Sequence, residues 1–166
     1  MKNSITGLFL TFMFMSLGAQ DLSLPEFKAA KPEDYTSYET DVLRCINWFT
    51  STPVNVQEGR RKEAYAFFMK WLTGTPFVSV NLTEKIVTFT EPNGDLLFVF
   101  MGGWTKYAIE TRDNKNVYMG NLKGIESVLE FYTRNRDFLA KDKNVEKYLR
   151  MKEKGTLEEF IKANLE

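Results

Sequence analysis

Histidine is absent from this chain of 166 residues, and cysteine occurs once, at Cys45. Without histidine the chain cannot build a Ser-His-Asp or Cys-His nucleophilic site, an HExxH zinc site, or the commonest acid–base catalyst. A single cysteine excludes an intramolecular disulfide. Cys45 lies on the apolar face of a predicted helix, so we expect a buried and unreactive thiol; the alternative is an exposed thiol that forms an intermolecular disulfide.

Other familiar binding motifs are also missing. There is no phosphate-binding P-loop and no dinucleotide fingerprint. Residues 113–124, DNKNVYMGNLKG, resemble a calcium loop only loosely, because the glycine at loop position 6 is missing and Gly124 stands where the bidentate glutamate belongs. We therefore predict no metal site and no cofactor.

The overall charge gives no sign of a nucleic-acid partner. Lys and Arg number 22, and so do Asp and Glu. A chain without an excess of positive charge lacks the electrostatic signature of nucleic-acid binding. Basic residues are more frequent than acidic ones in residues 112–154, which we interpret as a solvated helical surface.

The first twenty residues, MKNSITGLFLTFMFMSLGAQ, have the layout of a secretory signal peptide. Lys2 precedes an apolar stretch, Ile5–Leu17, and small residues follow it. The stretch is about 13 residues long, against the roughly 20 that a spanning helix needs, so a membrane anchor is the less favoured alternative. We expect residues 1–20 to be removed and the protein to be exported, to the periplasm or outside the cell, with no membrane span afterwards.

The remaining chain predicts one helical domain. Residues 21–35 contain two prolines and read as a partly ordered lead-in, and residues 36–166 form the domain. Apolar residues recur at helical spacing, most regularly in residues 118–132. Four capping-box patterns, in which a polar residue precedes Glu by three positions, mark expected helix starts at Thr36, Asn55, Asn81 and Thr156. We predict an all-α compact bundle of six to seven short antiparallel helices. Near residues 77–90 we expect an extended segment before the short helix that starts at Asn81, with a short β-hairpin as the alternative.

The stretch LLFVFMGGWTKYAIE, residues 96–110, predicts a helix at the centre of this bundle, because it is apolar all round. Its glycines need a reason, since glycine destabilises a helix interior by about 1 kcal/mol relative to alanine. We expect close packing of Gly102 and Gly103 against Gly120 and Gly124 of the next helix. A kink at the two glycines, or an opening for a ligand, are the alternatives.

Two groups of side chains are candidates for a ligand or partner site. Trp104, Thr105, Lys106 and Tyr107 place a cation and hydrogen-bonding groups beside an apolar floor. Arg60 and Arg61 form a second, smaller candidate patch.

These features favour a non-enzymatic binding or interaction module, with an unknown protein or a small apolar ligand as partner. A carrier of a small apolar ligand is the first alternative, and an enclosed apolar cavity beside Trp104 would support it. A carboxylate-dependent glycan hydrolase is the second, and two facing carboxylates in a cleft would support it. The oligomeric state cannot be predicted from the sequence.

Four segments carry a family resemblance: KWLTGTP, FMGGWTKYA, GNLKGIESVLEFY and DKNVEKYLRMKEKGTLEEF. Over residues 39–163 the chain resembles uncharacterised small secreted or periplasmic α-helical proteins from Bacteroidetes-type bacteria. The resemblance implies a bacterial export route, and it implies no activity and no functional residue.

Overall fold

The computed structural model describes residues 22–165, so the predicted signal peptide at 1–20 lies outside the described residues. Within this part the chain is all-helical, as predicted, and contains no strand. Its helices are α1 Pro32–Ser37, α2 Glu39–Ser51, α3 Glu58–Gly74, α4 Asp95–Thr111, α5 Val117–Arg134, α6 Lys143–Glu153 and α7 Leu157–Ala163. None of the described helices is long and apolar enough to cross a membrane.

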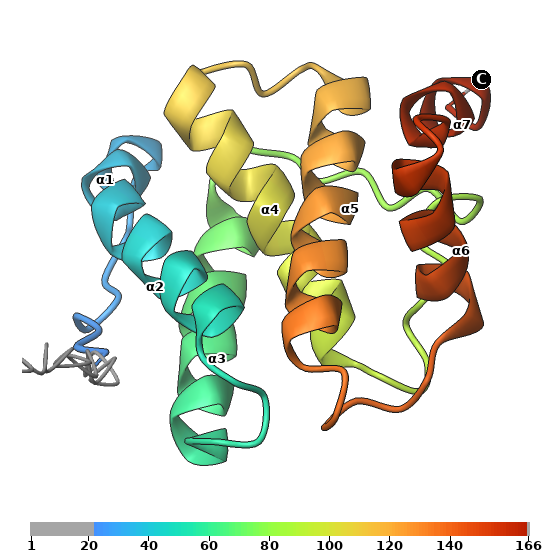
Figure 1. Ribbon diagram of the computed structural model, residues 1–166. Helices are drawn as coiled ribbons and strands as arrows, with labels where there is room; N and C mark the ends of the chain where they lie inside the picture. Colours follow the sequence, from blue (N-terminus) through green and yellow to red (C-terminus); the bar gives the residue numbers. More distant parts are fainter. Residues whose placement is uncertain (1–21, 166) are drawn as a thin grey trace, which may run out of the picture.

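Helices α4 and α5 form the centre of the molecule, as an antiparallel pair (Figure 1). Helices α2 and α3 pack on one side of this pair, and α6 and α7 lie on the other. Helix α4 is central because it is apolar on nearly every side: ten of its residues are buried. The prediction of a central helix at residues 96–110 is confirmed.

Residues 75–94 connect α3 to α4 by passing across to the side of α6 and returning (Figure 1). They contain no strand, and Ile86 and Phe89 are buried in the core, so the β-hairpin alternative is wrong. The prediction of a helix that starts at Asn81 is also wrong. The structure has only a single turn there, in which the backbone N–H groups of Ile86 and Val87 donate to the carbonyl of Thr83. The Tyr148 hydroxyl donates to the Ile86 carbonyl at 2.8 Å and fixes this segment to α6.

The capping boxes locate helix starts only partly. Thr36 lies inside α1 and does not cap α2, whose N-cap residue is Tyr38. Helix α3 begins at Glu58 after Gln57, which has a left-handed φ of 53°, so the cap expected at Asn55 is also wrong. Thr156 is the N-cap residue of α7 as predicted, but its side chain accepts no capping hydrogen bond. The side chains that do cap helices are Asn116 before α5 and Asp142 before α6.

Three of the four glycines, Gly103, Gly120 and Gly124, lie in the contact between α4 and α5. A β-carbon at Gly103 would lie 2.6 Å from the backbone oxygen of Lys123, so the two backbones touch here. Gly120 makes room for the Trp104 side chain of α4, and Gly124 makes room for the side chain and the backbone oxygen of Phe100.

Gly102 faces a different helix. A β-carbon there would lie 2.8 Å from the Phe49 ring of α2, so Gly102 makes room for α2. Helix α4 continues through both glycines without interruption, and their role is to admit neighbours on two sides.

Cys45 is fully buried in the described core, as expected of an unreactive thiol. Its Sγ donates to the carbonyl of Ala64 at 3.2 Å. Burial raises the pKa of the Cys45 thiol to about 12, because a thiolate would lose its hydration there. An intermolecular disulfide would require this part of the core to open.

Candidate functional site

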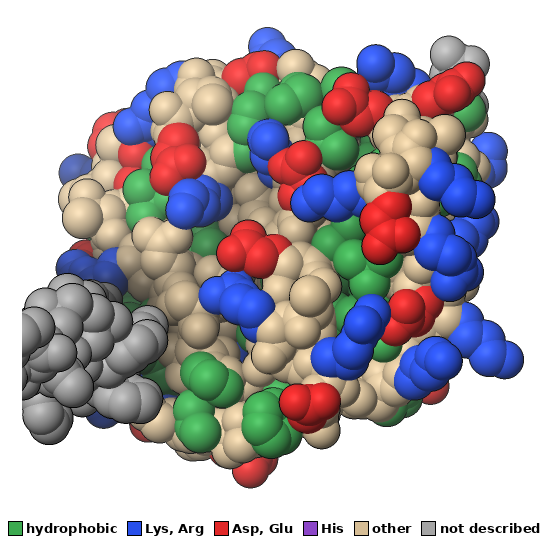
Figure 2. Space-filling view, in the orientation of Figure 1, with side chains coloured by type: hydrophobic (Ala, Val, Ile, Leu, Met, Phe, Trp, Pro, Cys, Tyr) green, Lys and Arg blue, Asp and Glu red, His purple; other side chains and the backbone are tan. Residues whose placement is uncertain are grey.

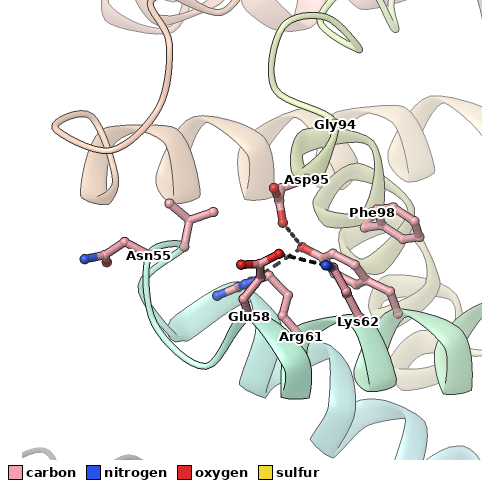
Figure 3. Close-up of a pocket in the computed structure, with 9 residues that line it drawn as sticks. Asn55, Glu58, Arg61, Lys62, Gly94, Asp95 and Phe98 are labelled. Carbon is pink, nitrogen blue, oxygen red and sulfur yellow. Dashed lines mark hydrogen bonds and ion pairs between the residues drawn. The ribbon is translucent and has the colours of Figure 1, made fainter.

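A hollow of the described residues lies where the α2–α3 loop and the first turns of α3 and α4 meet (Figure 3). We call it the α3–α4 groove. It has a volume of about 450 Å³, which is within the usual range of small-molecule sites. It is lined by Val54, Asn55, Glu58, Arg61, Lys62, Tyr65, Gly94, Asp95 and Phe98.

Tyr65 connects the two sides of the groove. Its hydroxyl donates to Oδ1 of Asp95 at 2.6 Å and accepts from the guanidinium of Arg61 at 3.4 Å. Burial, and then the hydrogen bond to Asp95, raise the pKa of the Tyr65 phenol. Tyr65 therefore stays protonated, and its hydrogen bond holds the Asp95 carboxylate in a fixed orientation.

Asp95 keeps one oxygen available. It is the first residue of α4, where a carboxylate is favoured by the helix dipole, and its side chain is half-buried. Oδ2 has no donor among residues 22–165 and is not among the buried unpartnered atoms, so solvent or a ligand can reach it. A ligand that brings a hydrogen-bond donor into the groove would find an oriented acceptor.

An aromatic pair forms the apolar wall of the groove. The rings of Tyr65 and Phe98 stack with their centroids 4.0 Å apart and their planes 7° apart. The stack joins α3 to α4 and offers a flat apolar surface beside the Asp95 carboxylate. Such a combination suits a ligand with a polar end and a short apolar part.

Arg61 lies at the base of the groove and is almost fully buried, with 3% of its surface exposed. Its guanidinium donates to the carbonyls of Phe49, Thr52 and Pro53 at 2.8–2.9 Å, and so satisfies the C-terminal end of α2. These hydrogen bonds attach to α3 the loop that contains Val54 and Asn55. Arg61 therefore positions this wall of the groove.

Glu58 and Lys62 lie at the mouth of the groove as an exposed i,i+4 ion pair of 2.7 Å. The hydrogen bond from Lys62 lowers the pKa of Glu58, so Glu58 is ionised at neutral pH. An exposed pair of this kind contributes little stability and exchanges easily with water or ligand groups.

The first predicted candidate group does not form one site. Trp104 is 2% exposed and packs over Gly120, and Thr105 is fully buried. Lys106 donates to the Asn47 side chain at 2.8 Å, whereas Tyr107 donates to Asp113 at 2.7 Å. Because successive helix residues point about 100° apart, four adjacent side chains cannot converge on one ligand.

The second predicted group separates in the same way. Arg61 lines the α3–α4 groove, but Arg60 points along the surface and pairs with Glu63 at 2.9 Å. Tyr65, Asp95 and Phe98 were not among the sequence candidates for a site. Only Asp95 carried a signal, as the acid that follows the Pro-Asn-Gly turn and begins a helix.

A smaller described hollow of about 230 Å³ lies between the start of α2 and the end of α4. Glu39, 7% exposed, accepts from Arg112 at 2.7 Å on its edge. No group of three potential metal ligands occurs in residues 22–165. No protein-family model, curated protein or solved structure matches this chain.

Proposed function

We propose that the protein is a non-enzymatic binding module and that the α3–α4 groove holds its ligand. The ligand donates an ammonium or amide N–H to Asp95 and lays a short apolar or aromatic part against the Tyr65–Phe98 stack. The observation that carries this proposal is the Asp95 carboxylate, which Tyr65 orients through one oxygen while the other oxygen remains accessible.

The groove is prepared for binding without a rearrangement of its walls. The hydrogen bonds from Arg61 hold the loop before α3 in place, and the aromatic stack holds α4 against α3. Groups held in their binding geometry lose little conformational entropy when a ligand arrives. Only the exposed Glu58–Lys62 pair needs to move at the mouth.

A carboxylate-dependent hydrolase is less well supported by this groove, although Glu58 and Asp95 both line it. A glycosidase needs a carboxyl group with a raised pKa as its general acid. The pKa of Glu58 is lowered instead. A carrier of an apolar ligand is also less well supported, because the space beside Trp104 is filled by Gly120 and Phe100.

Isothermal titration with arylalkylamines such as phenylethylamine, and with short peptides, tests the proposal. Asp95→Asn removes the charge but keeps a good residue for a helix start, so the variant should fold. Glu63→Gln is the matched control, since Glu63 lies on α3 outside the groove. We expect binding that is weakened about 10-fold or more by Asp95→Asn and unchanged by Glu63→Gln, in line with the loss of a charged hydrogen bond. Equal binding by all three proteins would overturn the proposal.

We also propose that the protein is exported, by the bacterial route that the resemblance implies. The layout of residues 1–20 supports this proposal. N-terminal sequencing of the protein isolated from its source tests it. A chain that starts after Ala19 or Gln20 would support export, and a chain that keeps Lys2 and the apolar stretch would contradict signal cleavage.

A further inference from the structure

Helix α6 carries a row of positive charges on its outer face. Lys143, Lys147, Arg150 and Lys154 follow one another at i, i+4, i+7 and i+11, the last being the C-cap residue. At 3.6 residues per turn these positions fall within an arc of roughly 60°. All four are exposed. We call this row the α6 stripe, and Figure 2 shows Lys and Arg side chains gathered along the edge of the molecule that α6 forms.

The four cations of the stripe are not paired with carboxylates in the described part of the chain. Helix α6 carries two acids: Glu146 is engaged by Arg136 at 3.0 Å, and Glu153, three residues after Arg150, forms no ion pair with the stripe in the described residues. Lys147 lies over the Phe160 ring of α7, 4.9 Å from its centroid, and this contact leaves its charge unneutralised. Helices α3 and α5 form i,i+3 and i,i+4 ion pairs on their surfaces, whereas the cations of the stripe form none within residues 22–165.

The stripe does not serve the stability of α6. Like charges three or four residues apart destabilise a helix, and the stripe contains three such pairs in succession. Cations near the last turn are favoured by the helix dipole, which accounts for Arg150 and Lys154. Lys143 is the first residue of the helix, where the same dipole disfavours a cation. The helix dipole and the Phe160 contact therefore give no structural reason for Lys143, nor for the alignment of all four cations in one row.

We propose that the α6 stripe is an electrostatic docking surface for a layer of anionic phospholipid headgroups. Three of its four cations are lysines, compact point charges that suit diffuse attraction better than bidentate recognition. The stripe itself contains no aromatic residue on which nucleic-acid bases could stack. Clusters of four or more basic residues on an amphipathic helix bind anionic lipid surfaces in this way. The inward residues Val145 and Tyr148 are committed to the core, so the contact is peripheral and no apolar face enters the bilayer.

Cosedimentation of the full chain with vesicles of phosphatidylglycerol and phosphatidylcholine tests this surface. The stripe variant changes Lys143, Lys147, Arg150 and Lys154 to Gln, which preserves helix propensity. A control with the same net charge changes four exposed lysines elsewhere to Gln: Lys28, Lys70, Lys85 and Lys115. We expect the control to bind much as the wild type does. The stripe variant should bind at least 10-fold more weakly, since each cation at an anionic surface contributes about 5-fold.

Three results would overturn the proposal. Equal binding by the stripe variant and the control would show that total charge, and not the stripe, governs the contact. Equal binding to pure phosphatidylcholine vesicles would show that anionic headgroups are not recognised. Tighter binding to duplex DNA than to the anionic vesicles at the same salt concentration, lost in the stripe variant, would assign the stripe to nucleic acid. Circular dichroism confirms that each variant is folded.

Discussion

The contact of Gly103 in α4 with the backbone of α5 predicts a strong penalty for one added methyl group. In Gly103→Ala the new β-carbon would lie 2.6 Å from the backbone oxygen of Lys123 and 2.8 Å from the Ser127 β-carbon. A backbone oxygen in the middle of a helix cannot rotate away, so the two central helices must separate. Overpacking of this kind lowers the free energy of unfolding by about 3 kcal/mol at the upper end of its range. The higher helix propensity of alanine relative to glycine offsets about 1 kcal/mol of this loss. We expect a net loss of about 2 kcal/mol.

Gly59→Ala is the matched control, because Gly59 lies in α3 with nothing within 4 Å of its added β-carbon. The same change there should stabilise the protein by up to about 1 kcal/mol. Urea denaturation followed by tryptophan fluorescence measures both variants. For a domain of this size the loss in Gly103→Ala corresponds to a melting temperature about 4–8 °C lower. A Gly103→Ala protein as stable as the wild type would refute the close packing of α4 on α5.

Three further predictions concern the core and its connections. Arg61→Met should lower the free energy of unfolding by about 3 kcal/mol or more, because hydrogen bonds to three carbonyls are lost; in urea titrations Arg60→Met should change it by less than about 0.5 kcal/mol. The pKa of Cys45 in the folded state, about 12, lies above its ordinary value of 9.0, so the thiol stays protonated to a higher pH in the folded state than in the unfolded state. Stability should therefore fall by about 1.4 kcal/mol per pH unit from this group as pH rises from 9.0 towards 12, a slope that Cys45→Ala removes; a wild type and variant with parallel pH profiles would contradict the burial of the thiol. Asn93→Ala should cost about 1–3 kcal/mol, because the Asn93 amide both donates to and accepts from the backbone of Ala140; denaturation midpoints unchanged from wild type would show that this link is dispensable.

Helical periodicity predicted the fold because burial of an apolar face is what holds these helices. In α5, Leu122, Ile125, Leu129 and Tyr132 all lie in the core, as their spacing predicts. The same physics identified α4 as the central helix. Both inferences rest on many residues acting together, so no single local exception could overturn them.

Capping patterns were less informative because each depends on one side chain and its local backbone. Asp34 accepts from the backbone N–H groups of Ala30 and Lys31, and α1 begins at Pro32, upstream of the expected start at Thr36. Gln57 adopts a left-handed conformation and delays α3 past Asn55. These choices depend on how the ends of the helices meet other helices, and a single window of sequence does not contain that information.

The candidate site could be predicted only in fragments. Tyr65 and Asp95 are thirty residues apart and meet only after α3 and α4 pack together. Adjacent polar and aromatic residues, such as those that begin at Trp104, suggest a site in a sequence. On a helix, however, their side chains point in different directions. Arg61 was a candidate for binding, and the structure shows that three backbone carbonyls occupy its guanidinium.

The most direct test of the proposed function is an NMR map of backbone amide shifts during titration with phenylethylamine. The α3–α4 groove predicts that the largest changes occur at Tyr65, Asp95 and Phe98, and that they disappear in Asp95→Asn. Changes centred on Trp104–Tyr107, or no localised change with any of the amines and short peptides, would contradict it.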